Sequence, residues 1–192
     1  MWHDLLGDAR LFDFLLRADQ ELAAQVRAGR CVACGGPLHS ARYPRKPRGA
    51  RVELDREYLW RHSFCCGTEG CRKRATPPSV RFLGRRVYLG AVVVLVSAMV
   101  GGISERRAAE MRDLVGVSVR TLRRWRDWWR EIFVATDFWK EARARLSPPV
   151  AIDRMPASLL ERFAPRLARD GLAALLRFLA PISSASSSAV GR

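Results

Sequence analysis

Five cysteines carry the most recognisable chemistry in this chain of 192 residues. Cys31 and Cys34 form a Cys-x2-Cys pair followed by two glycines, and the other three lie in the stretch FCCGTEGCRKR at 64–74. Zinc takes four tetrahedral ligands, which two short cysteine turns supply in pairs. Four residues separate Cys66 from Cys71, which fits a second turn. The sequence therefore predicts one structural zinc ion bound by Cys31, Cys34, Cys66 and Cys71.

Cys65 is the alternative ligand in the second turn. Five residues separate it from Cys71, one more than the usual spacing, and two adjacent cysteines would strain a tetrahedral site. His39 and His62 are further candidate ligands. A redox role for the Cys-x-x-Cys pair is disfavoured because no βαβ pattern surrounds it.

Cationic side chains are the second chemical feature. Lys and Arg number 34 against 19 Asp and Glu, which gives a net charge of +15. Such a surplus predicts a polyanionic partner, because each phosphate that a protein neutralises releases a condensed counterion. Nucleic acid ranks ahead of an anionic membrane surface. Six cations in the cysteine segment at 29–84 are expected to contact the phosphates of the nucleic-acid backbone: Arg45, Lys46, Arg48, Arg72, Lys73 and Arg74.

The stretch GVSVRTLRRWRDWW at 116–129 predicts the second helix of a helix-turn-helix motif. Gly116 can take the positive φ of a tight turn, and Ser118 can cap the helix that follows. The apolar stripe Leu122, Trp125, Trp129 and Phe133 would pack inward and leave cations on the outer face. Early residues of such a helix enter the major groove. The predicted DNA-facing residues are Ser118, Arg120, Thr121, Arg123 and Arg124.

Hydrophobic periodicity and helix-cap signals predict the elements that hold these residues. The expected fold is mostly α with a small β zinc ribbon, and it contains a three-helix helix-turn-helix module with helical extensions. The chain divides into an amphipathic helix ended by Gly29, a zinc ribbon, the helix-turn-helix module, a helical extension and a disordered tail, at 1–28, 29–84, 85–135, 136–182 and 183–192. Short β-prone pieces are expected at 51–54 and 59–64. The expected helices of the second half are 105–115, the one after Ser118, 157–163 and 166–179.

The most apolar run, at 88–103, has 16 residues. A bilayer span needs about 20 apolar residues, so a buried core helix is the better interpretation. Acidic residues stand where an export signal would be basic. The chain is therefore expected to be cytoplasmic, associated with the nucleoid and not bound to a membrane.

Three motifs taken in order resemble the N-terminal region of bacterial insertion-sequence transposases: CVACGG, then RHSFCCGTEGCRKRATPP, then ISERRAAEMRDLVGVSVRTLRRW. In that family a zinc ribbon precedes a helix-turn-helix that binds transposon ends. The resemblance covers about residues 31–135. It implies that Cys31, Cys34, Cys66 and Cys71 are zinc ligands and that Arg120, Thr121 and Arg124 face DNA.

The catalytic domain of such transposases has an RNase H-like fold, and no βββαβ pattern follows residue 135 here. The later acids fall on helical or loop stretches with no strand to present them. The predicted function is therefore a non-enzymatic, bacterial, double-stranded DNA-binding protein, a transposase-related module that acts as a regulator or as a targeting subunit. On this hypothesis the zinc directs Arg72, Lys73 and Arg74 beside the groove-reading helix.

Two alternatives remain open. One is a protein-interaction adaptor, with Trp2, Trp128, Trp139 and the segment LLRFL at 175–179 as anchors. The other is an accessory subunit of a separately encoded recombinase or nuclease. Beyond double-stranded DNA, the candidate partners are thus a recombinase and a second copy of the chain in a homodimer.

Overall fold

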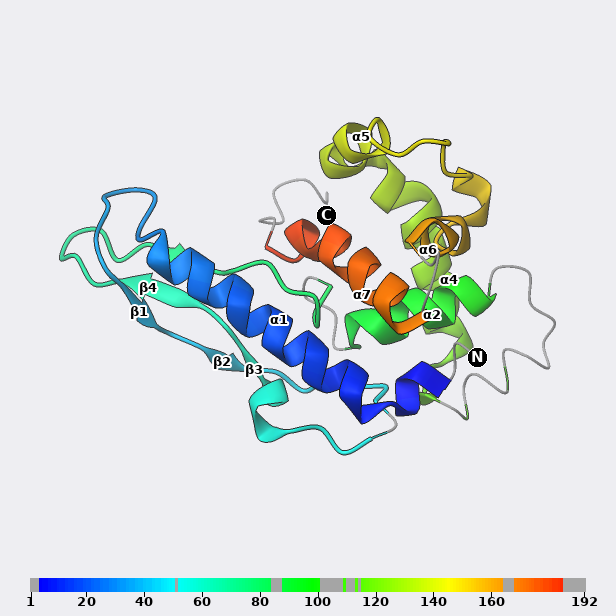
Figure 1. Cartoon of the computed structure of the whole chain (residues 1–192), viewed down its shortest axis with the longest axis horizontal. Helices are drawn as coiled ribbons and strands as arrows, with labels where there is room; N and C mark the ends of the chain where they lie inside the picture. The colour runs from blue at the N-terminus through cyan, green and yellow to red at the C-terminus, as the bar shows by residue number, and fades with distance from the viewer. Residues whose placement is uncertain are drawn as a thin grey trace.

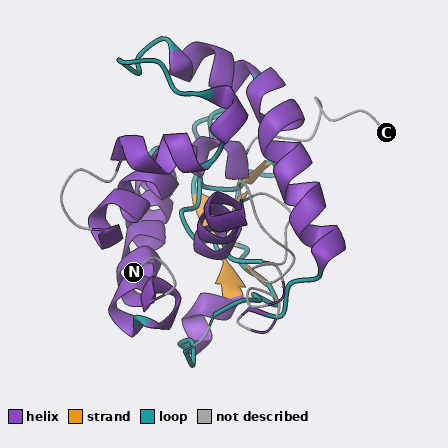
Figure 2. Ribbon diagram, turned by 90° about the vertical axis from the view of Figure 1, so that its right-hand side faces the viewer, coloured by secondary structure: helices purple, strands orange, loops and turns teal. Residues whose placement is uncertain are grey.

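The computed structural model describes residues 4–50, 52–83, 88–100, 109, 113, 115–163 and 168–184. These residues are mostly helical and carry a small amount of antiparallel sheet (Figure 2), which confirms the coarse fold class. Helix 105–115 of the predicted motif falls almost wholly outside the described residues, as do Trp2 and residues 185–192 of the predicted tail. The prediction that the disordered tail begins at Ser183 is wrong, because Ser183 ends a 3-10 helix at Ala180–Ser183.

The first helix, α1, spans Ala9–Ala28 and follows a 3-10 turn at Asp4–Gly7. It begins later than the sequence predicts because the Asp8 side chain accepts a hydrogen bond from the Arg10 N–H at 3.0 Å and caps the helix there. It ends before Gly29, as predicted. Its buried face is apolar apart from one acid, and comprises Leu11, Phe12, Leu15, Ala18, Asp19 and Ala23.

Five short strands form two sheets in the described part of the cysteine segment, residues 29–83. Strands β1 (Leu38–Ser40), β4 (Phe64–Cys66) and β5 (Arg74–Ala75) pair antiparallel in the order β1-β4-β5. Strands β2 (Tyr43–Pro44) and β3 (Trp60–Arg61) make the second sheet. The β-prone piece at 59–64 thus supplies β3 and the start of β4, whereas residues 52–54 form no strand.

The apolar run forms α2, Gly90–Val100. Every side chain from Ala91 to Val96 is at most 1% exposed, which is the burial expected of a helix that is apolar on all sides. Helix α2 packs against α4 (Val119–Asp127), α6 (Ala157–Phe163) and α7 (Ala168–Leu179). Among the described helices, none combines the length and the hydropathy that crossing a bilayer requires.

Helix α4 begins at the predicted cap, because the Ser118 hydroxyl oxygen accepts a hydrogen bond from the Thr121 N–H at 3.2 Å. It continues directly into a π-helix at Trp128–Phe133, which the sequence does not predict. Helix α5, Asp137–Arg143, follows after a cap by Thr136. The predicted inward stripe is confirmed, since its four side chains are at most 4% exposed: Leu122, Trp125, Trp129 and Phe133.

The described residues form two hydrophobic cores. The large one unites the N-terminal half of α1 with α2, α4, α6 and α7, and also takes in Tyr58 and Phe82 from the cysteine segment. The small one lies beside the C-terminal half of α1 and consists of Ala23, Cys31, Leu38, Phe64 and Cys66. Accordingly, the cysteine loops lie at one end of the molecule and α4 lies at the other (Figure 1).

A buried ion pair connects α1 to the cysteine segment. The Asp19 carboxylate accepts hydrogen bonds from Arg81 Nε at 2.8 Å, from the Val80 N–H at 2.6 Å and from the Ser79 hydroxyl at 2.5 Å. Both charged side chains are fully buried. Arg81 also donates to the carbonyl oxygens of Tyr58 and Trp60. This network fixes the start of α2 relative to α1, because Gly90 donates its N–H to the Arg81 carbonyl at 2.7 Å.

Candidate metal centre and nucleic-acid interface

The first cysteine turn is a tight backbone loop directly after α1. The carbonyl of Cys31 accepts hydrogen bonds from the N–H groups of Gly35 at 2.7 Å and Cys34 at 3.3 Å. Gly35 has a φ of +68°, which glycine adopts without a steric penalty. Gly36 leaves no room for a side chain: a Cβ there would lie 2.0 Å from Thr68 Oγ1 and 3.1 Å from Cys66 Sγ. The second glycine is therefore needed for the two cysteine turns to approach each other.

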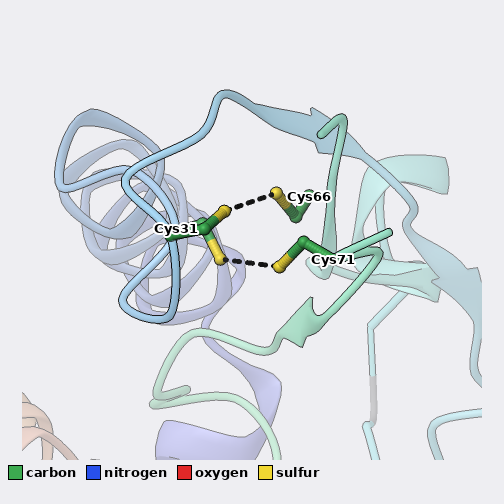
Figure 3. A group of neighbouring side chains, drawn as sticks. Cys31, Cys66 and Cys71 are labelled. Atoms are coloured by element: carbon green, nitrogen blue, oxygen red, sulfur yellow. Dashed lines mark hydrogen bonds between the residues drawn. The ribbon is translucent and has the colours of Figure 1, made fainter. Parts of the chain in front are cut away.

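The second turn lies between β4 and β5. Gly67 donates its N–H to the Pro37 carbonyl at 2.9 Å, and Cys71 donates its N–H to the Thr68 carbonyl at 3.2 Å. Cys66 and Cys71 face the first turn across a short gap (Figure 3). The Sγ atoms of Cys31 and Cys71 are 3.8 Å apart, and those of Cys34 and Cys66 are 3.5 Å apart.

The four predicted cysteines thus form one cluster, in which all four sulfur atoms lie within 4.8 Å of one another. Cys31 and Cys66 are buried, Cys71 is half-buried and Cys34 is exposed. Four sulfurs at this spacing could hold a metal ion, and they are compatible with a single zinc.

Hydrogen bonds polarise the thiols of this cluster. The pKa of Cys34 falls from its ordinary value to about 6, chiefly because the Gly36 backbone donates to its sulfur, with further help from Cys71, Cys66 and Thr68. At Cys71 the Lys73 backbone lowers the pKa, but the neighbouring sulfurs of Cys34, Cys31 and Cys66, together with desolvation, outweigh it and raise the pKa to about 11. Cys34 therefore loses its proton more readily than Cys71.

Cys65 lies apart from the cluster. Its Sγ–H donates to the carbonyls of Arg72 at 3.4 Å and Cys66 at 3.7 Å. Successive residues of a strand point to opposite faces, so the burial of Cys66 turns Cys65 away from the other sulfurs. The candidate ligands His39 and His62 also lie outside the cluster. His39 is exposed, and burial lowers the pKa of His62, whose Nε2 has no hydrogen-bond partner within the described structure.

The start of α4 presents the predicted cationic face. Arg120, Arg123 and Arg124 are exposed, while their neighbours Leu122 and Trp125 are buried. The hydroxyl groups are engaged locally, because Ser118 Oγ and Thr121 Oγ1 lie 3.0 Å apart as part of the cap. The exposed side chains in the first two turns of this helix are therefore the three arginines.

The six cations of the cysteine segment lie in two separate places. Lys46 and Arg48 are exposed, and Arg45 is half-buried with its guanidinium 5.2 Å from the centre of the Phe82 ring. Arg72, Lys73 and Arg74 are exposed at the cysteine end. The hypothesis that the cysteine turn directs these three cations beside α4 is wrong, because α1 separates the two regions along the molecule (Figure 1). A helix of 20 residues is about 30 Å long.

The adaptor alternative loses most of its predicted anchors. Trp139 is 1% exposed, and Leu175, Leu176 and Leu179 are fully buried in the large core. Trp128 is half-buried and packs edge-on against Trp129.

Comparison with protein families, curated proteins and solved structures gives no match to this chain. The resemblance to transposase N-terminal regions rests on the three quoted motifs.

Proposed function

We propose that this chain is a double-stranded DNA-binding protein that reads the major groove with α4 and uses one zinc ion as a structural support. It acts without catalysis, as a transposase-related recognition module that regulates a promoter or targets a separately encoded recombinase. The observation that carries the proposal is the two-sided character of α4. Its inner face is buried in the large core, and its outer face offers Arg120, Arg123 and Arg124 in its first two turns.

This arrangement suits recognition of base edges. A rigid helix with an anchored inner face holds its outer side chains in fixed directions, and arginine pairs in bidentate fashion with O6 and N7 of guanine. The net charge of +15 supplies the non-specific attraction to phosphate that brings such a helix to the duplex. Capping by Ser118 fixes where the helix starts, and hence which side chains come first.

The zinc ion has a structural task in this proposal. Among the described residues, the small core beside the cysteine turns contains five that are buried, which is too little apolar surface to hold the turns by packing alone. Cys31, Cys34, Cys66 and Cys71 would close the two turns with four metal bonds.

Base readout by α4 is tested with Arg124→Ala on a duplex selected by the wild-type chain from a random library. If Arg124 reads a base, the substitution weakens specific binding by about 1 to 3 kcal/mol and relaxes the preference at one position. Arg162→Ala is the matched control, because Arg162 is exposed on α6. Equal weakening on the selected and a scrambled duplex would show a phosphate contact instead.

A further inference from the structure

Tyr88 joins the loop at 45–49 to the start of α4. Its backbone pairs with Arg48 in an isolated parallel bridge, and the Leu89 N–H donates to the Arg48 carbonyl at 3.2 Å. Its hydroxyl donates to the Gly116 carbonyl at 3.1 Å. Its ring meets Trp125 edge-on, with centroids 5.1 Å apart and an interplanar angle of 81°. One residue therefore contacts both the cationic loop and the turn from which α4 begins.

The loop itself is fixed on both sides of its exposed cations. On one side the Arg45 N–H donates to the Leu59 carbonyl at 2.6 Å. On the other side Gly49, with a φ of +93°, lies so close to α2 that a Cβ would stand 2.8 Å from the Val92 side chain. Lys46 and Arg48 are exposed between these two anchors. Their position relative to α4 is therefore set by the fold.

We infer that Lys46 and Arg48 contact the phosphates at the edge of the same major groove that α4 enters. Tyr88 is the positioning residue that sets the distance between these two cations and α4. The inference rests on the proposed DNA binding. One interstrand spacing, about 4.8 Å, and one tyrosine side chain separate the Arg48 backbone from the turn at Gly116. That span is of the order of the major-groove width, about 12 Å.

Arg72, Lys73 and Arg74 lie too far from α4 to contact the same groove. They lie toward the far end of α1, whose length of about 30 Å exceeds the width of one groove. The predicted phosphate contacts are thus not equivalent: those in the loop at 45–49 lie beside α4, and those at Arg72, Lys73 and Arg74 do not.

The first test uses the double variant Lys46→Ala/Arg48→Ala on the duplex selected by the wild-type chain. Loss of two phosphate contacts flattens the slope of log K against log salt by about 1.8. In this variant the DNA backbone also loses its protection from hydroxyl radicals. The loss is expected beside the base pair at which Arg124→Ala relaxes the sequence preference. The charge-matched control is Arg143→Ala/Arg145→Ala, since Arg143 is the exposed last residue of α5 and Arg145 is exposed just after it. The control leaves the slope and the footprint unchanged.

The second test uses Tyr88→Phe, which keeps the ring against Trp125 and removes only the hydrogen bond to Gly116. The ratio of affinities for the selected and a scrambled duplex falls about 2- to 10-fold, as expected for one hydrogen bond, while the salt slope stays the same. A purely structural role would lower the melting temperature and weaken binding to both duplexes alike.

Three results overturn the inference: an unchanged slope in the loop variant, lost protection about one helical turn away from the Arg124 position, or an unchanged affinity ratio in Tyr88→Phe. Each of these results counts against the inference provided that the wild-type chain selects a duplex from the random library. Failure of the wild-type chain to select any duplex sinks the proposed function itself, so the two failures are distinguishable.

Discussion

Removing the carboxylate of Asp19 should destabilise the protein severely. Asp19→Ala leaves the Arg81 guanidinium fully buried with no counter-charge, and it deprives Ser79 and Val80 of their acceptor. Breaking one side of a buried pair costs about 3 to 5 kcal/mol in the free energy of unfolding. A small domain has about 5 to 15 kcal/mol in total, so this one carboxylate accounts for a large fraction.

The assay is urea unfolding followed by circular dichroism, with two comparison variants. Asp19→Leu/Arg81→Met replaces both charges by apolar groups and should recover most of the loss, because the desolvation of two ions is then avoided. Glu161→Ala removes the partner of Arg154 in a surface pair whose side chains are 59% and 57% exposed, and it should cost less than about 1 kcal/mol. If Asp19→Ala costs no more than Glu161→Ala, the network does not hold α1 to the cysteine segment.

Three further predictions concern the metal centre and its surroundings. Cys66→Ser should release the zinc, whereas Cys65→Ser should retain about one zinc per chain, because of these two residues Cys66 is the one that faces the other sulfurs. The measurement is plasma mass spectrometry, and equal zinc content in the two variants would contradict the assignment. Gly36→Ala should weaken zinc affinity about 10- to 100-fold in a chelator competition, because its Cβ would press on Thr68 and the sulfurs, while Gly7→Ala, with nothing within 4 Å, should have no effect. Burial and the nearby Arg81 lower the pKa of His62 below 6.5, so the unfolded state binds a proton first as the pH falls, and stability should drop below about pH 6.5. The stability difference between wild type and His62→Gln should therefore change between pH 7.5 and 5.5; parallel pH profiles would refute this explanation.

The cysteine cluster and α4 could be predicted from sequence because their signals are local. Cysteine spacing defines a turn without reference to the rest of the chain, and Ser118 with its apolar stripe defines the start and the inner face of a helix. Cysteine spacing favours Cys66 over Cys65 but leaves Cys65 as an alternative, because the spacing does not say which face of β4 is buried.

The features that could not be predicted from the sequence depend on contacts between distant residues. Asp19 and Arg81 are 62 positions apart, and each reads as an ordinary surface charge. One signal was available: Asp19 stands four residues after Leu15, on the face of α1 that also carries Leu11 and Ala23. An acid on an apolar helical face indicates a buried partner. The placement of Arg72, Lys73 and Arg74 far from α4 had no such signal, since it follows from how the long helix α1 spaces the two cores.

The most direct test of the central proposal is the salt dependence of duplex binding by the intact chain, measured by fluorescence anisotropy between 50 and 300 mM NaCl, roughly the range over which counterion release is evident. Contacts with at least three phosphates predict a slope of log K against log salt of about −2.7 or steeper. A flat dependence, or the absence of binding at low salt, would contradict the proposal that this chain binds DNA.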